Sequence, residues 1–91
     1  MDSDRSLEVR RYIGTRIAHA RNVEGISQQR LATRLSNYTG EEWSRVMVTK
    51  LENGGKRIDV ELLCAVAVVQ DRPVSWYFAD APSTLADAIP G

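Results

Sequence analysis

The stretch 44–53 holds side chains that can read base pairs, at a spacing that would gather them on one face of a helix. At about 100° per residue, that face carries two basic side chains, one hydroxyl and one small apolar group. These residues are Arg45, Val46, Thr49 and Lys50. Arginine and lysine can donate to guanine, threonine suits several partners, and valine fits a thymine methyl group. An ordinary amphipathic surface helix has the same pattern, so the rest of the chain must decide between the two interpretations.

The opposite face of this stretch is apolar and is expected to pack inward. Its residues are Met47, Val48 and Leu51. Ser44 is a good N-cap, and Gly54 with Gly55 supplies a C-terminal stop. The sequence therefore predicts a short helix, 44–53, with an outer face of donors and small apolar groups.

The charge of the chain is balanced overall but unevenly distributed. The 91 residues have a formal net charge of +0. Residues 1–58 carry eleven Lys and Arg against seven Asp and Glu, a net +4. Residues 59–91 carry one Arg against five acidic residues, a net −4. A basic front and an acidic back can bind an anionic surface on one side only.

The residue types argue against several other classes of protein. The single cysteine, Cys64, excludes an internal disulfide and fits a reducing compartment. No run approaches the ~18 apolar residues of a membrane span, and the acidic N-terminus lacks the apolar core of a signal peptide. His19 and Cys64 have no companions at ligand or catalytic spacing. We therefore expect a cytoplasmic protein that is not an enzyme and needs neither cofactor nor metal.

Periodicity and capping residues predict five helices in one all-α domain, 1–78. The expected helices are 6–22, 27–35, 44–53, 59–70 and 74–78. Ser6, Ser27 and Asp59 are the expected N-caps of the first, second and fourth helices. Gly14 is unfavourable inside the first helix, which suggests close packing of another backbone there.

The segments outside these helices are a long loop and a tail. The loop 36–43 is predicted from its turn-forming residues, which are Asn37, Thr39 and Gly40. The helix 59–70 is apolar on nearly all sides, which indicates burial or an interface. The tail 79–91 holds two prolines and is expected to be poorly ordered unless a partner docks it.

Three segments in this order resemble the Cro/CI-like (Xre) helix-turn-helix family of bacterial and phage regulators. They are Gly25-Ile26-Ser27-Gln28-Gln29-Arg30-Leu31-Ala32, Val48-Thr49-Lys50-Leu51-Glu52-Asn53-Gly54 and Ser75-Trp76-Tyr77-Phe78. The resemblance spans 13–78 and implies a five-helix bundle of the lambda-repressor-like type. It also implies that 44–53 is the recognition helix, with Ser44, Arg45, Val46, Thr49 and Lys50 facing base edges. The chain departs from the family in its longer loop between helices two and three.

Other residues are expected to hold the DNA backbone. Gln28 begins the second helix, where backbone amides and a polar side chain can clamp a phosphate; simple solvation is the alternative. Asn53, Lys56 and Arg57 are further candidates for phosphate contacts, or belong to a solvated basic loop. Lys50 can also bind a phosphate, in which case it would not contribute to the recognition of the base sequence.

Two further sets are expected to have structural roles. The resemblance implies an ion pair between Arg21 and Glu52 that ties the first helix to the third. The aromatic run is expected to close the core, or else to form a dimer interface with the fourth helix and the tail. Its residues are Trp76, Tyr77 and Phe78.

Taken together, these features predict a sequence-specific transcriptional regulator, a repressor, that binds double-stranded DNA as a homodimer. One recognition helix reads too few base pairs to compete with a genome of other sites, so two copies are expected. One alternative is the DNA-binding antitoxin of a toxin–antitoxin pair, with 79–91 as the toxin-binding tail. Another is a protein-interaction module that keeps the fold without binding DNA. The family implies a bacterial or phage origin.

Overall fold

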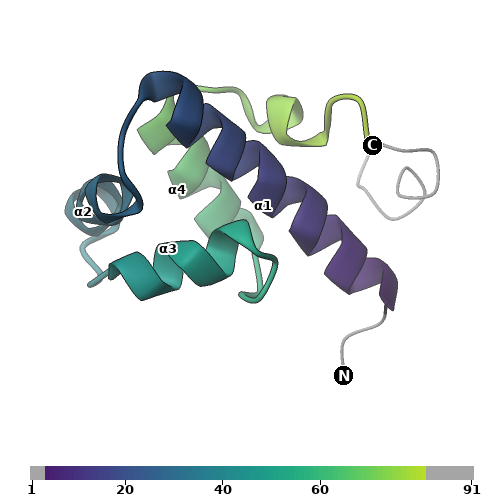
Figure 1. Ribbon diagram of the computed structural model, residues 1–91, viewed down its shortest axis with the longest axis horizontal. Helices are drawn as coiled ribbons and strands as arrows, with labels where there is room; N and C mark the ends of the chain where they lie inside the picture. The colour runs from purple at the N-terminus through teal and green to yellow at the C-terminus, as the bar shows by residue number, and fades with distance from the viewer. Residues whose placement is uncertain (1–3, 82–91) are drawn as a thin grey trace.

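The computed structural model describes residues 4–81, which form four α-helices followed by one 3₁₀ helix (Figure 1). The elements are α1 (Asp4–Glu24), α2 (Gln28–Thr39), α3 (Arg45–Glu52), α4 (Val60–Gln70) and η1 (Val74–Phe78). No strand occurs in the described part of the chain, so the predicted all-α class is confirmed. The prediction of five α-helices is wrong in its last member, because η1 is a 3₁₀ helix. Pro73 precedes it without a side-chain cap, and five residues suit the tighter 3₁₀ turn.

The first helix is longer than predicted at both ends. It begins at Asp4, so Ser6 lies inside the first turns and is not the N-cap. No helix breaker precedes Ser6, and the helix therefore extends past it. It ends at Glu24, two residues after the predicted end. Gly25 stops it in a left-handed conformation with φ of 79°, where a side chain would be strained.

The second helix also extends further, and the predicted loop 36–43 is consequently wrong in its first half. Ser27 caps α2 as predicted, accepting a hydrogen bond from the Arg30 amide at 3.0 Å. The hydroxyl of Thr39 donates to the Leu35 carbonyl at 2.7 Å, so its hydrogen bond lies within the helix. Gly40, with φ of 77°, ends the helix. Only a short connection therefore separates α2 from α3.

The core lies where all the elements meet. Its fully buried side chains come from each of them: Ile17, Leu31, Leu35, Val48, Leu51, Val66 and Tyr77. Trp43, in the connection before α3, is 6% exposed and belongs to the same core. Its amide donates to the Ser36 hydroxyl at 2.8 Å, which ties the connection back onto α2. α3 packs against both α1 and α2, while α4 lies behind α1 in Figure 1 and packs against α2, α1 and η1.

The aromatic run at η1 closes this core. Tyr77 is fully buried, and its hydroxyl donates to Gln70 Oε1 at 2.7 Å. Trp76 and Phe78 pack against the core and remain half-buried. The guanidinium groups of Arg16 and Arg72 lie 3.9 Å and 4.3 Å from the centre of the Trp76 ring. Most of the aromatic surface therefore has partners within the chain.

Some predictions fall outside the described residues. The tail prediction for 79–91 concerns residues that are described only as far as 81, and residues 1–3 are likewise outside the described part. Within that part, no helix is both long and apolar enough to cross a membrane.

Candidate nucleic-acid interface

The outer face of α3 presents most of the side chains that the sequence singled out for base contacts. Ser44 caps the helix, and its hydroxyl accepts a hydrogen bond from the Met47 amide at 3.2 Å. The inward-facing residues Val48 and Leu51 are fully buried. Ser44, Arg45 and Lys50 are exposed, Val46 is 55% exposed, and Thr49 is half-buried. Because the apolar side anchors the helix, its polar side is left outward.

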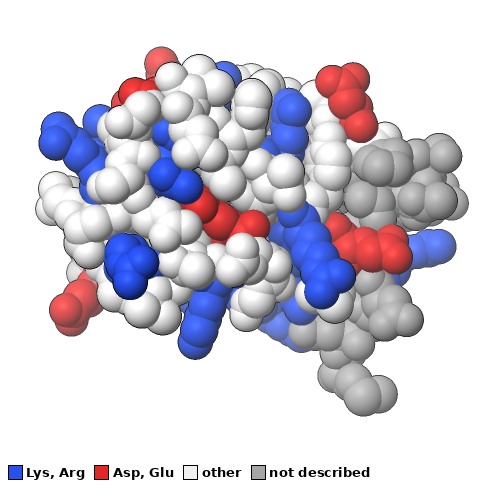
Figure 2. All heavy atoms as spheres, in the orientation of Figure 1, with Lys and Arg blue, Asp and Glu red and all other residues white. Residues whose placement is uncertain are grey.

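The surface around α3 carries several positive charges. Figure 2 shows Lys and Arg side chains projecting from the part of this face formed by α3 and along neighbouring α1. This distribution matches the excess of basic residues in 1–58. A basic surface around an exposed helix can attract an anionic polymer, with an attraction that salt would weaken.

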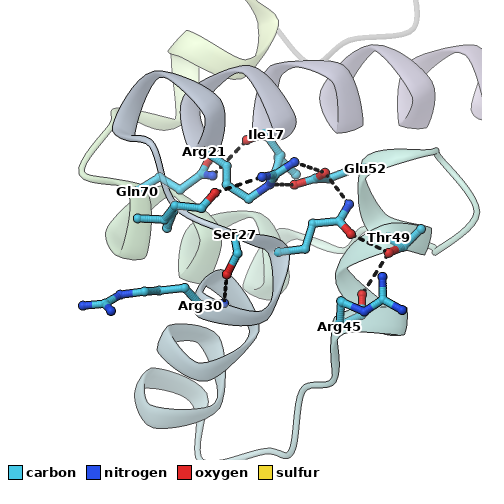
Figure 3. A network of polar contacts seen from close by, with 10 residues as sticks. Ile17, Arg21, Ser27, Arg30, Arg45, Thr49, Glu52 and Gln70 are labelled. Atoms are coloured by element: carbon cyan, nitrogen blue, oxygen red, sulfur yellow. Dashed lines mark hydrogen bonds and ion pairs between the residues drawn. The ribbon is translucent and has the colours of Figure 1, made fainter.

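A bidentate ion pair holds the end of α3 against α1. Arg21 donates from Nε to Glu52 Oε2 at 2.7 Å and from Nη2 to Oε1 at 3.1 Å (Figure 3). Arg21 also donates from Nη1 to the Ile26 carbonyl at 2.9 Å. The hydrogen bonds to Glu52 raise the pKa of Arg21, against the opposing effect of burial. Glu52 is 9% exposed, so this pair is largely screened from solvent.

The ion pair continues into a chain of hydrogen bonds that reaches the outer face. Gln28 donates from Nε2 to Glu52 Oε1 at 2.9 Å, and its Oε1 accepts from the Thr49 hydroxyl at 2.8 Å. Gln28 therefore connects the start of α2 to two successive turns of α3. A phosphate contact by Gln28 stays a prediction, and would use its second amide hydrogen or its backbone amide.

Thr49 is more constrained than a freely exposed base-reading residue. Its single hydroxyl hydrogen is shared between Gln28 Oε1 and the Arg45 carbonyl, at 2.8 Å and 3.0 Å. The hydroxyl oxygen and the methyl group are what it can still offer to a base. Base contact by Thr49 stays a prediction, with an acceptor or apolar role in place of donation.

Gly14 allows the backbones of α1 and α3 to meet, as its unfavourable position in a helix predicted. A Cβ atom at this residue would lie 2.5 Å from the Glu52 carbonyl oxygen and 2.6 Å from that of Leu51. Any side chain would consequently push the end of α3 away from α1. The close approach and the ion pair thus act on the same turn of α3.

The predicted phosphate-binding residues of the loop differ in their surroundings. Asn53 is exposed at the C-cap of α3. Lys56 is half-buried, with its ammonium 5.4 Å from the centre of the Trp43 ring. Arg57 is exposed to solvent, but it also interacts with another group of the chain. The three residues follow α3 directly and share its end of the molecule, and their contacts with phosphate stay predictions.

Sequence reasoning missed two features that position this site. Arg10 donates from Nε to the Gly54 carbonyl at 3.1 Å, which fastens the loop after α3 to α1. The link from Gln28 to Thr49 was missed as well. Gln28 and Thr49 were each assigned a separate contact with DNA. Helical periodicity contains no signal for a contact between residues of different elements. The packing of the loop against α1 did have one signal in the sequence, which was the glycine at position 54: Gly54 is buried and has a φ of 79°.

Comparison of the chain with protein-family models, curated protein sequences and solved structures found no match. The resemblance to the Cro/CI-like family consequently depends on the three sequence segments and stays a prediction. The geometry of α3 and its supports must carry any functional proposal.

Proposed function

We propose that this protein is a sequence-specific DNA-binding transcriptional regulator that inserts α3 into the major groove. The observation that carries the proposal is the outward face of α3, held in place by buried contacts on its other side. Arg45, Val46 and Lys50 are exposed there, next to one another on a helix narrow enough for the groove. α2 precedes α3 and packs against it, in the arrangement that a helix-turn-helix reader requires.

Rigid support favours recognition over a generic charged surface. An isolated helix of eight residues is too short to persist in water, so α3 depends on its tertiary contacts. Those contacts come from Gly14, Arg21 and Gln28, on two different helices. A reading helix that is ordered before binding loses less conformational entropy on the DNA. Repression, the Cro/CI-like family and a bacterial or phage origin stay part of the proposal.

The test is selection of bound sequences from a random pool of DNA duplexes, for the wild type and for Arg45→Ala. We expect a short motif from the wild type, and a loss of about tenfold to hundredfold preference at one base pair in the variant. Arg34→Ala is the matched control, because Arg34 lies on α2 in an exposed ion pair with Glu24 at 2.6 Å. The control should give the wild-type motif.

Lys50→Ala separates base reading from phosphate binding at the second basic position. Loss of preference at one base pair would assign Lys50 to a base, whereas uniform weakening with a shallower salt dependence would assign it to a phosphate. A wild-type protein that selects no motif at moderate salt contradicts the proposed function. The fold would then be a protein-interaction module.

A further inference from the structure

A hollow in the surface lies between the two segments that flank α3. It has a volume of about 360 Å³. Its walls come from the end of α2, the connection 40–44, the loop 53–59 and the first turns of α4. Ligand pockets in proteins commonly have volumes of roughly 300 to 1,000 Å³, so the space suits a small molecule.

One wall of the hollow contains a hydrogen-bond donor that the folded chain leaves without an acceptor. Trp43 lines the hollow and is only 6% exposed. Its indole Nε1 is buried and has no hydrogen-bond partner among the described residues. Because nearly all buried polar groups in proteins are paired, an unsatisfied N–H in the wall of a hollow favours a bound acceptor there.

Unpaired charges of both signs surround the same hollow. The Lys56 ammonium lies 5.4 Å from the centre of the Trp43 ring, while Glu41 and Glu61 come from the connection and from α4. Within residues 4–81, none of these three charged groups forms an ion pair. They line one hollow yet lie too far apart to meet, so a molecule with one charge of each sign could bridge them.

The other two charged residues of the lining already have partners within the chain. Asp59 caps α4 by accepting a hydrogen bond from the Leu62 amide at 2.7 Å. Arg57 interacts with another group of the chain. The charges that remain for a ligand are consequently one ammonium group and two carboxylates.

The hollow also offers apolar surface to a ligand. Leu62 and Ala65 line it from α4, and their spacing of three residues places them on one side of that helix. Tyr38 and the Trp43 ring add aromatic surface. Apolar lining with a few polar groups is typical of small-molecule sites, where the polar groups fix the orientation of the ligand.

We propose that this hollow binds an α-amino acid with an apolar side chain. The carboxylate of the amino acid accepts from Trp43 Nε1 and lies beside the Lys56 ammonium. Its α-ammonium group lies between Glu41 and Glu61, and its side chain rests on the apolar surface of α4. A simple anion would leave the two glutamates unpaired, and a simple cation would leave the indole donor and Lys56 unpaired. A zwitterion meets both requirements.

NMR spectroscopy of the nitrogen-15-labelled full chain tests this proposal. No DNA is present, so the outcome does not depend on the proposed function. We expect L-leucine and L-phenylalanine to move the Trp43 indole N–H signal until it saturates, with a dissociation constant of about 1 mM or below. The indole signal of Trp76 is the internal control and should stay in place, because Trp76 lies in η1 and does not line the hollow.

Derivatives of leucine identify which of its charges are bound. L-leucinamide lacks the carboxylate, and N-acetyl-L-leucine lacks the ammonium group. Each derivative loses charge-assisted hydrogen bonds at one end, so each should bind at least about tenfold more weakly than L-leucine.

Substitutions around the hollow test the assigned partners. Lys56→Gln should weaken binding about tenfold through the carboxylate, and Glu41→Gln and Glu61→Gln should do so through the ammonium group. Glu42→Gln is the matched control and should bind as the wild type does, because Glu42 is exposed beside Glu41 but does not line the hollow. Circular dichroism of each variant confirms that the helices persist.

Three results would overturn the proposal. The first is a Trp43 indole signal that neither amino acid moves to saturation. The second is L-leucinamide or N-acetyl-L-leucine binding as tightly as L-leucine. The third is binding that Lys56→Gln leaves unchanged, or that neither Glu41→Gln nor Glu61→Gln weakens.

Discussion

Replacing Arg21 by alanine should destabilise the protein far more than replacing Arg34, although both arginines form ion pairs of nearly equal length. Arg21 Nε lies 2.7 Å from Glu52 Oε2, and Arg34 Nη1 lies 2.6 Å from Glu24 Oε1. The two pairs differ in exposure. The side chains of the first pair are 14% and 5% exposed, and those of the second are 35% and 43% exposed.

The expected magnitudes follow from this difference. Without Arg21, the Glu52 carboxylate stays buried with Gln28 as its remaining side-chain donor. Breaking a buried pair in this way costs about 3–5 kcal/mol in free energy of unfolding. One kcal/mol shifts the melting temperature of a domain of this size by about 4–8 °C, so we expect Arg21→Ala to melt at least about 12 °C lower. Arg34→Ala should cost at most about 1 kcal/mol.

Thermal and urea unfolding, followed by circular dichroism, measure the melting temperature and the free energy of unfolding of both variants. A double-mutant cycle with Glu52→Ala isolates the pair itself, and we expect a coupling energy of about 2 kcal/mol. The reasoning fails if Arg21→Ala and Arg34→Ala lose the same stability. It also fails if the cycle shows no coupling, because the loss would then come from the contact between Arg21 and the Ile26 carbonyl.

Two other perturbations have defined outcomes. Gly14→Ala should lower the free energy of unfolding by about 1–3 kcal/mol in urea titrations, because its Cβ would collide with the Glu52 carbonyl. Gly55→Ala is its control, since a Cβ there lies 3.6 Å from the nearest atom and should be tolerated. Burial raises the pKa of Tyr77 from 10.0 to about 12, although Arg72 opposes the shift. The folded state therefore holds the hydroxyl proton of Tyr77 more tightly than the unfolded state does. The contribution of this group to the free energy of unfolding should be complete below pH 10 and should fall by about 2 kcal/mol by pH 12. Urea titrations across this range should show that decline in the wild type and lack it in Tyr77→Phe.

The helix starts were largely predictable, because a capping residue acts on its own neighbours. Ser27, Ser44 and Asp59 each accept a hydrogen bond from an amide three residues later. Helix ends were less predictable. Thr39 is a turn former in one context, yet here its hydroxyl bonds the carbonyl four residues before it within the helix. The glycine that follows, and not the polar residues before it, decided where α2 stops.

The supports of the candidate site were predictable only where a local rule applied. A glycine inside a helix implied that another backbone approaches, and Gly14 indeed faces the end of α3. Only the resemblance suggested the pairing of Arg21 with Glu52. The two residues lie 31 positions apart, and no local pattern in the sequence joins them. The bond between Gln28 and Thr49 had no signal of either kind, because it exists only once α2 and α3 are packed.

This last bond changes what α3 is expected to read. Thr49 lies in the middle of the helix, and donating to Gln28 and to the Arg45 carbonyl uses its only hydroxyl hydrogen. In the proposed complex with DNA, donation to bases would consequently fall to Arg45 and Lys50, while Val46 and the Thr49 methyl group would suit thymine. Because Gln28 also holds Glu52, the outer face is coupled to the ion pair that anchors the helix. Thr49→Val keeps the shape and the methyl group and replaces the hydroxyl with a second methyl, so it should keep a thymine preference while leaving Gln28 Oε1 without its partner on α3. Loss of that preference in the selected motif would instead mean that the hydroxyl itself reads the base.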